Sequence, residues 1–90
     1  MAKRLVVTGR VQGVGYRASF AEQAMALQLS GWVRNRRDGA VEALVGGDEK
    51  AVGTIIAWAR RGPATARVDN IAIEDADAPV DGEFKILATV

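Results

Sequence analysis

Apolar residues recur at two different periods along this chain. In the segment Lys3–Arg10 they alternate, so that Leu5, Val7 and Gly9 share one face, as expected for a β-strand. Later segments of the same kind predict further strands over Gly31–Asn35, Ala40–Gly46 and Arg67–Glu74, and a short terminal strand with Phe84 and Ile86 pointing inward. Most of the chain's strands are therefore short and separated by other elements.

Two segments between the strands follow the helical period instead. From Arg17 to Gln28, one helical face carries Tyr16, Phe20, Ala21, Ala24 and Leu27. The second helix begins at Asp48, which is a good N-cap, and ends at Gly62-Pro63. Its apolar residues, spaced i, i+3, i+4 and i+7, are Val52, Ile55, Ile56 and Ala59. Each helix thus has one face suited to packing on a sheet.

The resulting order is β-α-β-β-α-β plus a terminal strand, reached through a polar linker over Asp75–Gly82. We expect an α+β fold, the ferredoxin-like α/β sandwich, with both helices on one face of an antiparallel sheet. The segment 36–39 joins the second and third strands as a hairpin turn, with Gly39 at positive φ. Right-handed crossovers make the first two strands parallel, with the third between them. Their C-terminal ends then lie at one edge, about 10 Å apart.

Composition places limits on what this fold can do. Ninety residues fit one domain spanning residues 1–90, and no stretch approaches the length of a membrane span. No apolar signal region follows the N-terminus, so we expect a cytoplasmic protein that does not bind membranes. We also expect a monomer. The net charge of +1 argues against non-specific nucleic-acid binding, although several arginines gather in the first half of the chain. These arginines are Arg10, Arg17, Arg34, Arg36 and Arg37.

The start of the first helix is the most informative local feature. Between Gly9 and Tyr16 there is no Ser, Thr, Asp or Asn to cap it, and no acidic residue follows in its first turn. Free backbone N–H groups approached by Gly13 and Gly15, with Arg17 beside them, form a ready anion site. Water capping and ordinary glycine turns explain the same residues equally well, and two glycines form neither a Walker A motif nor a dinucleotide fingerprint.

Asn35 ends the second strand at the same edge of the sheet as this loop. The alternation places it on the helix-covered face, where its amide needs a partner, and a water held for attack is one such partner. Asparagine beside a turn is also common turn chemistry. Tyr16, Trp32 and Trp58 are interpreted as packing residues rather than stacking platforms.

Residue types that are missing narrow the chemistry further. The chain has no histidine and no cysteine, which excludes covalent phosphohistidine and phosphocysteine intermediates, a histidine base and the commoner zinc sites. No tight acidic cluster indicates a magnesium site, so we expect neither metal nor cofactor. A site of Arg and Asn acts by positioning and electrostatics. It suits acyl phosphates, because their carboxylate leaving group, with a conjugate-acid pKa of about 4, departs without a proton.

The sequence resembles the acylphosphatase family. The segment Gly9–Arg17 matches the family's phosphate-loop motif, and Gly31–Asn35 followed by Asp38–Glu42 matches its second motif; residues 61–63 and 66–68 resemble its later pattern. The resemblance implies hydrolysis of acyl phosphates, with Arg17 binding the phosphate and Asn35 positioning water. It also implies that the phosphate is held by the backbone amides of Gln12, Gly13, Val14, Gly15, Tyr16 and Arg17. Inorganic phosphate or other anions would then bind as product or inhibitors.

Two positions depart from the family pattern. Tyr16 stands where phenylalanine is common, and Gln28 stands where glycine often follows the first helix.

Two other functions remain as alternatives. One alternative is a non-catalytic domain of this fold that binds a phosphate metabolite. The other is RNA binding on the sheet, which requires exposed aromatic residues that the first and third strands lack.

Overall fold

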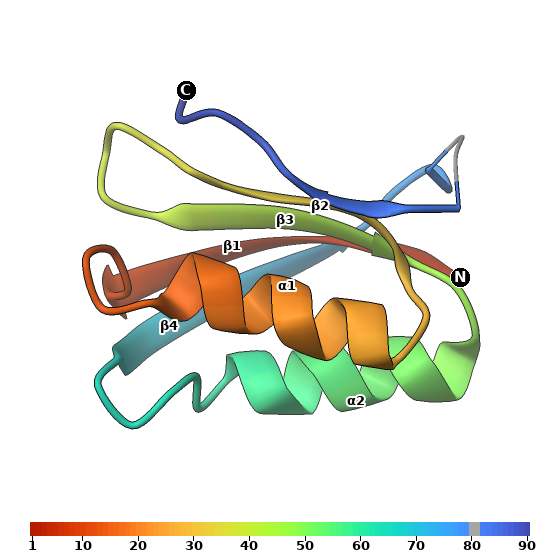
Figure 1. Ribbon diagram of the computed structural model, residues 1–90, viewed down its shortest axis with the longest axis horizontal. Helices are drawn as coiled ribbons and strands as arrows, with labels where there is room; N and C mark the ends of the chain where they lie inside the picture. The colour runs from red at the N-terminus through yellow and green to blue at the C-terminus, as the bar shows by residue number, and fades with distance from the viewer. Residues whose placement is uncertain (80–81) are drawn as a thin grey trace.

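Two helices cover one face of a five-stranded sheet (Figure 1). The computed structural model describes residues 1–79 and 82–90. In chain order the elements are β1 (Ala2–Arg10), α1 (Tyr16–Ala26), β2 (Ser30–Asn35), β3 (Val41–Gly46), α2 (Glu49–Ala59), β4 (Arg67–Asp75) and β5 (Phe84–Ile86). The predicted order β-α-β-β-α-β with a terminal strand is confirmed, and the fold is ferredoxin-like.

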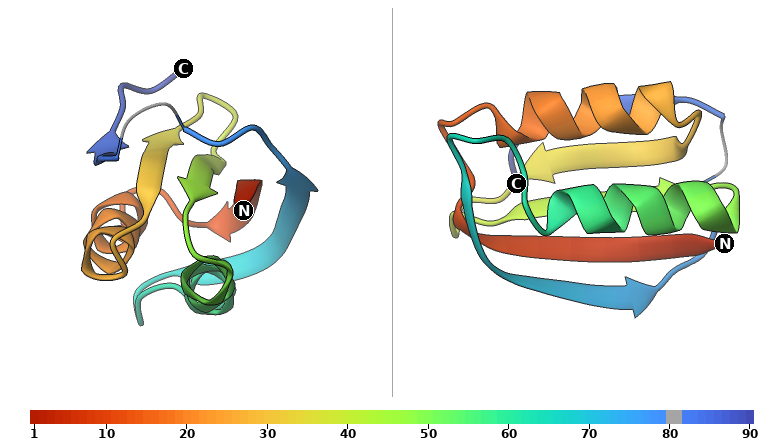
Figure 2. Two further views of the ribbon diagram at one scale, coloured as in Figure 1. Left: turned by 90° about the vertical axis from the view of Figure 1, so that its right-hand side faces the viewer. Right: turned by 90° about the horizontal axis from the view of Figure 1, so that it is seen from below.

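The strand order in the sheet is β4-β1-β3-β2-β5. β3 lies between β1 and β2 and is antiparallel to both, as the crossover rule predicts, so β1 and β2 run in the same direction. β4 pairs with the other side of β1, also antiparallel. β5 differs from the antiparallel prediction, because it pairs with β2 in parallel, with Phe84 opposite Gly31. The ends of β1 and β2 therefore lie two strand spacings apart at one end of the molecule (Figure 2).

The terminal strand is only partly inward-facing. Phe84 is buried and its ring lies 5.9 Å from that of Phe20, as predicted. The prediction for Ile86 is wrong, because this side chain is 47% exposed. β5 is a three-residue edge strand with a neighbour on one side only, so its far flank stays open to water. In the predicted linker Asp75–Gly82, Asp75 ends β4, and Val80 and Asp81 lie outside the described residues.

The core lies between the sheet and the helices and consists of the residues that the periodicity selected. The fully buried ones include Leu5, Val7, Phe20, Ala24, Val33, Val41, Val45, Val52, Ile55 and Ala59. Tyr16 and Phe20 form an aromatic cluster with Trp58, with ring centroids 5.5–6.3 Å apart, which confirms Tyr16 and Trp58 as packing residues. In the part of the chain that the structure describes, neither helix has the length and apolarity needed to cross a membrane.

The sheet's other face carries a network of charges instead of a helix layer. The Glu42 carboxylate on β3 is 4% exposed and accepts hydrogen bonds from Nε of Arg4 at 2.7 Å and Nε of Arg34 at 2.8 Å. Arg4 also pairs with Glu74 on β4, so the network spans four strands. The Arg34 guanidinium stacks on Trp32, 4.5 Å from the ring centroid. Both central arginines are thus held by a buried carboxylate.

Candidate active site

The two helices begin in different ways. α2 has Asp48 as its N-cap, whose Oδ2 accepts a hydrogen bond from the Ala51 N–H at 3.4 Å, and Glu49 follows in the first turn. α1 has Gly15 as its N-cap, with φ of 80°, no side-chain hydrogen bond and no acidic residue in its first turn. The predicted absence of a cap is confirmed. The first N–H groups of α1 therefore stay available to an external acceptor.

The loop before α1 is held in place by side chains on both of its flanks. Gln12 Nε2 donates hydrogen bonds to the backbone carbonyls of Arg36 at 2.7 Å and Ala40 at 2.8 Å. On the other flank, the Thr65 hydroxyl donates to the Val14 carbonyl at 2.7 Å. The loop is therefore fixed between the turn that follows β2 and the connection from α2 to β4.

Gly13 and Gly15 give this loop its shape. Both have positive φ, 75° and 80°, which an L-residue other than glycine adopts only at a cost. A Cβ atom at either position would meet no heavy atom within 4 Å among the residues described. Glycine is therefore favoured at these positions by the backbone conformation rather than by a lack of space for a Cβ atom. A loop with such curvature can direct successive N–H groups toward one anion.

Arg17 is the second residue of α1 and is half-exposed. No carboxylate among residues 1–79 and 82–90 lies within ion-pair distance of its guanidinium. It therefore provides five N–H donors beside the uncapped start of the helix. An anion seated at this helix start would be its natural partner.

Asn35 is the last residue of β2, where its backbone pairs with Val41 of β3. Its Oδ1 atom is buried and has no hydrogen-bond partner among the described residues. Buried polar atoms are nearly always paired, so an orphaned one calls for a ligand or a water molecule. Because Gln12 fixes the loop against the turn that directly follows Asn35, this orphaned oxygen lies at the same end of the sheet as the loop.

The segment after β5 completes this end of the molecule. The Leu87 N–H donates to the Val33 carbonyl, and the Val90 N–H donates to the Asn35 carbonyl at 3.1 Å. The Arg37 N–H in turn donates to the backbone oxygen of Val90 at 2.7 Å. The backbone around Asn35 is therefore held from both sides, by β3 and by this segment.

Titratable side chains contribute little to the acid–base chemistry of this site. Burial raises the pKa of Tyr16, and its hydroxyl already donates to the Ala59 carbonyl at 2.8 Å. Among the described residues, no three acidic side chains come close enough together to hold a metal ion. The available groups are thus backbone amides, one guanidinium and one carboxamide.

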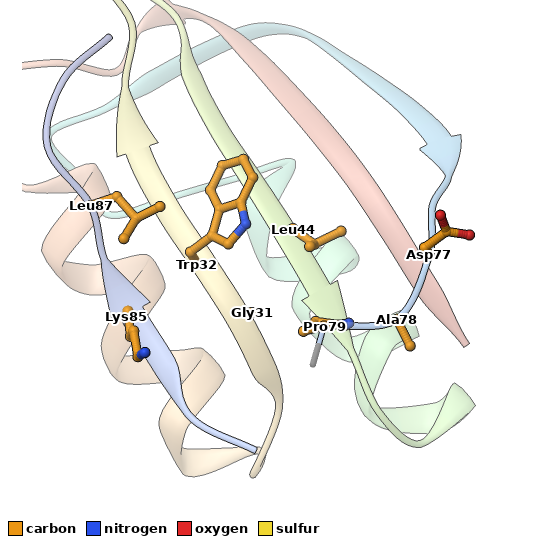
Figure 3. Close-up of a pocket in the computed structure, with 8 residues that line it drawn as sticks. All are labelled: Gly31, Trp32, Leu44, Asp77, Ala78, Pro79, Lys85 and Leu87. Carbon is orange, nitrogen blue, oxygen red and sulfur yellow. The ribbon is translucent and has the colours of Figure 1, made fainter. Parts of the chain in front are cut away.

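A separate cavity of about 420 Å³ lies on the open face of the sheet (Figure 3). Trp32, Leu44, Leu87 and Pro79 form its apolar walls, with Asp77 and Lys85 beside them. None of the predicted site residues lines it. The cavity is therefore distinct from the place where the loop and Asn35 meet.

Sequence reasoning missed the side chains that brace the site. It assigned Gln12 only a backbone role, whereas the structure gives its side chain two hydrogen bonds to the neighbouring turn. Gln12 was nevertheless the one long polar side chain in a loop of glycines and valines, which is a usable signal. Thr65 and the backbone bonds of Val90 left no comparable pattern.

Comparisons with known proteins identify the family of this chain. Residues 3–86 match the family model for acylphosphatase. An acylphosphatase of Rhodopseudomonas palustris (strain ATCC BAA-98 / CGA009) is 49% identical over 94 residues, covering 98% of this chain and 95% of that protein. Another, from Rhodopseudomonas palustris (strain BisB18), is 59% identical over 71 residues, covering 79% of this chain and 72% of that protein.

A solved structure shows the same likeness in three dimensions. The crystal structure of acylphosphatase from Bacillus subtilis has a TM-score of 0.90 and 34% sequence identity, and the match covers 96% of this chain and 97% of that one. The match extends over nearly the full length of both chains, in sequence and in fold. The chain belongs to the acylphosphatase family, which makes it a hydrolase of acyl phosphates.

Proposed function

We propose that hydrolysis occurs by direct attack of a water molecule on phosphorus, with Asn35 positioning the water and Arg17 holding the phosphate. The observation that carries this proposal is the orphaned Oδ1 of Asn35. An amide oxygen that is buried, unpaired and next to an anion loop can accept one proton of a water molecule. This contact orients the water's lone pair for in-line attack.

The phosphoryl group has its own set of donors, separate from Asn35. The free N–H groups at the start of α1, the curved loop before it and the guanidinium of Arg17 all favour an anion. These donors stabilise charge that spreads over the equatorial phosphoryl oxygens in the transition state. Because Gln12 and Thr65 brace the loop, the donors are ordered before the substrate arrives.

The chemical step balances without a protein acid or base. A bond forms between the water oxygen and phosphorus, and the bond between phosphorus and the acyl oxygen breaks. The bonding electron pair leaves with the carboxylate, whose conjugate acid has a pKa of about 4, so no proton is needed there. A proton of the attacking water passes to a phosphoryl oxygen. The products are inorganic phosphate and a free carboxylate.

The test follows benzoyl phosphate hydrolysis by absorbance in the wild-type protein and in two variants. Arg17→Gln removes the guanidinium and Asn35→Ala removes the carboxamide. Each substitution should lower kcat about 10²- to 10³-fold, which is the usual effect of losing one preorganised group. Asn70→Ala serves as the matched control, because Asn70 is exposed on β4. Phosphate inhibition should weaken mainly in Arg17→Gln. Full activity in Arg17→Gln or Asn35→Ala would refute the role given to that residue.

Two further measurements separate this mechanism from its rivals. In water labelled with ¹⁸O, the label should enter phosphate and not benzoate, because the bond to phosphorus is the one that breaks. EDTA should leave the rate unchanged. Label in benzoate would contradict attack at phosphorus, and phosphate binding without turnover would favour a non-catalytic domain.

A further inference from the structure

The arginines of this chain are distributed unevenly over the structure. Seven of the nine lie at the end of the sheet where the loop and Asn35 meet; they are Arg10, Arg17, Arg36, Arg37, Arg60, Arg61 and Arg67. The same segments (9–17, 36–40 and 60–70) contain only two acidic residues, Asp38 and Asp69. Since the whole chain has a net charge of +1, the rest of the molecule has an excess of negative charge.

The ion pairs increase this difference in charge between the site end and the rest of the molecule. At the site end, Arg36 pairs with Asp38 and Arg67 with Asp69, each at 3.0 Å. The five remaining arginines there have no carboxylate partner within the described parts of the chain. Elsewhere, Lys50 is the one Lys or Arg side chain without a carboxylate partner within those same parts. Unpaired positive charge is thus concentrated around the site.

Four of these unpaired arginines form what we call the arginine rim: Arg10, Arg37, Arg60 and Arg61. All four are exposed. Arg10 directly precedes the phosphate loop, and Arg37 lies two residues after Asn35. Arg60 and Arg61 begin the connection that touches the loop through Thr65. The rim residues therefore lie at the end of β1, in the β2–β3 turn and in the α2–β4 connection, and these segments lie at one end of the molecule (Figure 2).

The proposed mechanism has no use for these four cations. Arg17 and the backbone amides already match the charge of the phosphoryl group. Additional cations around the mouth of a site raise the local concentration of anions and their rate of association. They discriminate among acyl phosphates only where the acyl group itself is charged.

We propose that this site prefers acyl phosphates whose acyl group carries a second negative charge, such as a carboxylate, and that the arginine rim provides this preference. The inference rests on the proposed function and adds a substrate class to it. The second charge interacts with the rim in the bound substrate and in the transition state alike, so the preference appears in KM rather than in kcat.

The test compares succinyl phosphate with butyryl phosphate, which have acyl chains of equal length and differ by one carboxylate. At about 0.01 M ionic strength, where the Debye length is about 30 Å, kcat/KM should be about tenfold higher for succinyl phosphate. At about 1 M, where the Debye length is about 3 Å, the ratio should fall toward one. The difference in kcat/KM between the two substrates should arise from KM, with kcat nearly equal.

Variants test whether the arginine rim causes the preference for succinyl phosphate. Arg37→Gln, and Arg60→Gln combined with Arg61→Gln, should each lower the low-salt ratio at least about twofold, because each removes charge near the mouth of the site. The matched control is Lys50→Gln, which removes one unpaired cation from the other end of α2. The control should leave the ratio unchanged.

The outcomes separate this inference from the proposed function. If neither substrate is hydrolysed, the proposed function fails. If both are hydrolysed with equal kcat/KM at low ionic strength, the charge preference is refuted and the proposed function stands. An equal fall of the ratio in Lys50→Gln would assign the effect to total charge and refute the role of the rim.

Discussion

Replacing Gln28 with glycine should make this protein more stable. α1 ends in a Schellman motif, in which the Gln28 N–H donates to the Met25 carbonyl and the Leu29 N–H donates to the Ala24 carbonyl, both at 3.0 Å. This motif needs a left-handed residue at its turn, and Gln28 occupies that position with φ of 58°. It is the non-glycine residue with positive φ in the described chain. The acylphosphatase family often has glycine at this position.

The size of the effect follows from two opposing contributions. An L-residue in the left-handed region costs about 1–2 kcal/mol, which glycine avoids. Glycine in turn costs about 0.4–1 kcal/mol through the greater freedom of the unfolded chain. The Gln28 side chain is exposed and makes no hydrogen bond within the described residues, so its removal costs little more. The free energy of unfolding should rise by about 0.7 kcal/mol, and Tm by about 3–5 °C for a domain of this size.

Thermal unfolding followed by far-UV circular dichroism measures this shift, and urea unfolding confirms it if the midpoint rises at constant m-value. Gln28→Ala keeps the Cβ atom and should change Tm little. Gln23→Gly, the same substitution on the exposed surface of α1, should lower stability by about 1 kcal/mol. If Gln28→Gly also lowered Tm, the conformational argument would be refuted, because glycine would then be unfavourable at both positions.

Three further predictions concern the site and the open face of the sheet. Tyr16→Phe removes the hydroxyl that donates to the buried Ala59 carbonyl, so unfolding free energy should fall by about 1–2 kcal/mol in calorimetry, while benzoyl phosphate hydrolysis persists. Gln12→Leu removes both hydrogen bonds between the loop and the turn, so kcat should fall at least about tenfold in the same assay, and an unchanged kcat would refute the bracing role. Burial alone would raise the pKa of Glu42, but hydrogen bonds from Arg34 and Arg4 hold it below its ordinary value. This stability is present above the unfolded pKa of about 4.5 and is lost as pH falls through the folded value, so urea midpoints should drop between pH 6 and pH 3 less in Glu42→Gln than in wild type.

Most of the fold could be predicted because the sequence separates the two periods cleanly. The strand period, with every second residue apolar, selects Leu5 and Val7, and the helical period selects Val52, Ile55 and Ala59. All five side chains are buried. β5 was harder, since three residues carry little information about which strand they join or in which direction. Ile86 was misplaced for the same reason: alternation shows which side chains share a face, but not whether a neighbouring element covers that face.

The sequence indicated which residues to consider for the candidate site, but not the contacts that hold them in place. The missing cap before α1 was visible because capping depends on a few residue types within one turn. The two hydrogen bonds of Gln12 were not visible, because they depend on where a turn more than twenty residues away lies in space. Roles for Arg17 and Asn35 in the reaction remain predictions that the variants above test.

Polar groups in this molecule are paired on the open face of the sheet and unpaired at one end. Glu42 holds both Arg4 and Arg34 and is itself fully bonded, so that this face is stabilised without a second layer of helices. At the loop end, Arg17 has no carboxylate and Asn35 Oδ1 has no donor in the described chain. Exposed side chains without a partner are ordinary, but Asn35 Oδ1 is the one buried side-chain oxygen or nitrogen without a hydrogen-bond partner among the described residues. Because water reaches exposed groups freely and buried groups poorly, this orphaned oxygen is the reason to assign the site to a ligand rather than to solvent.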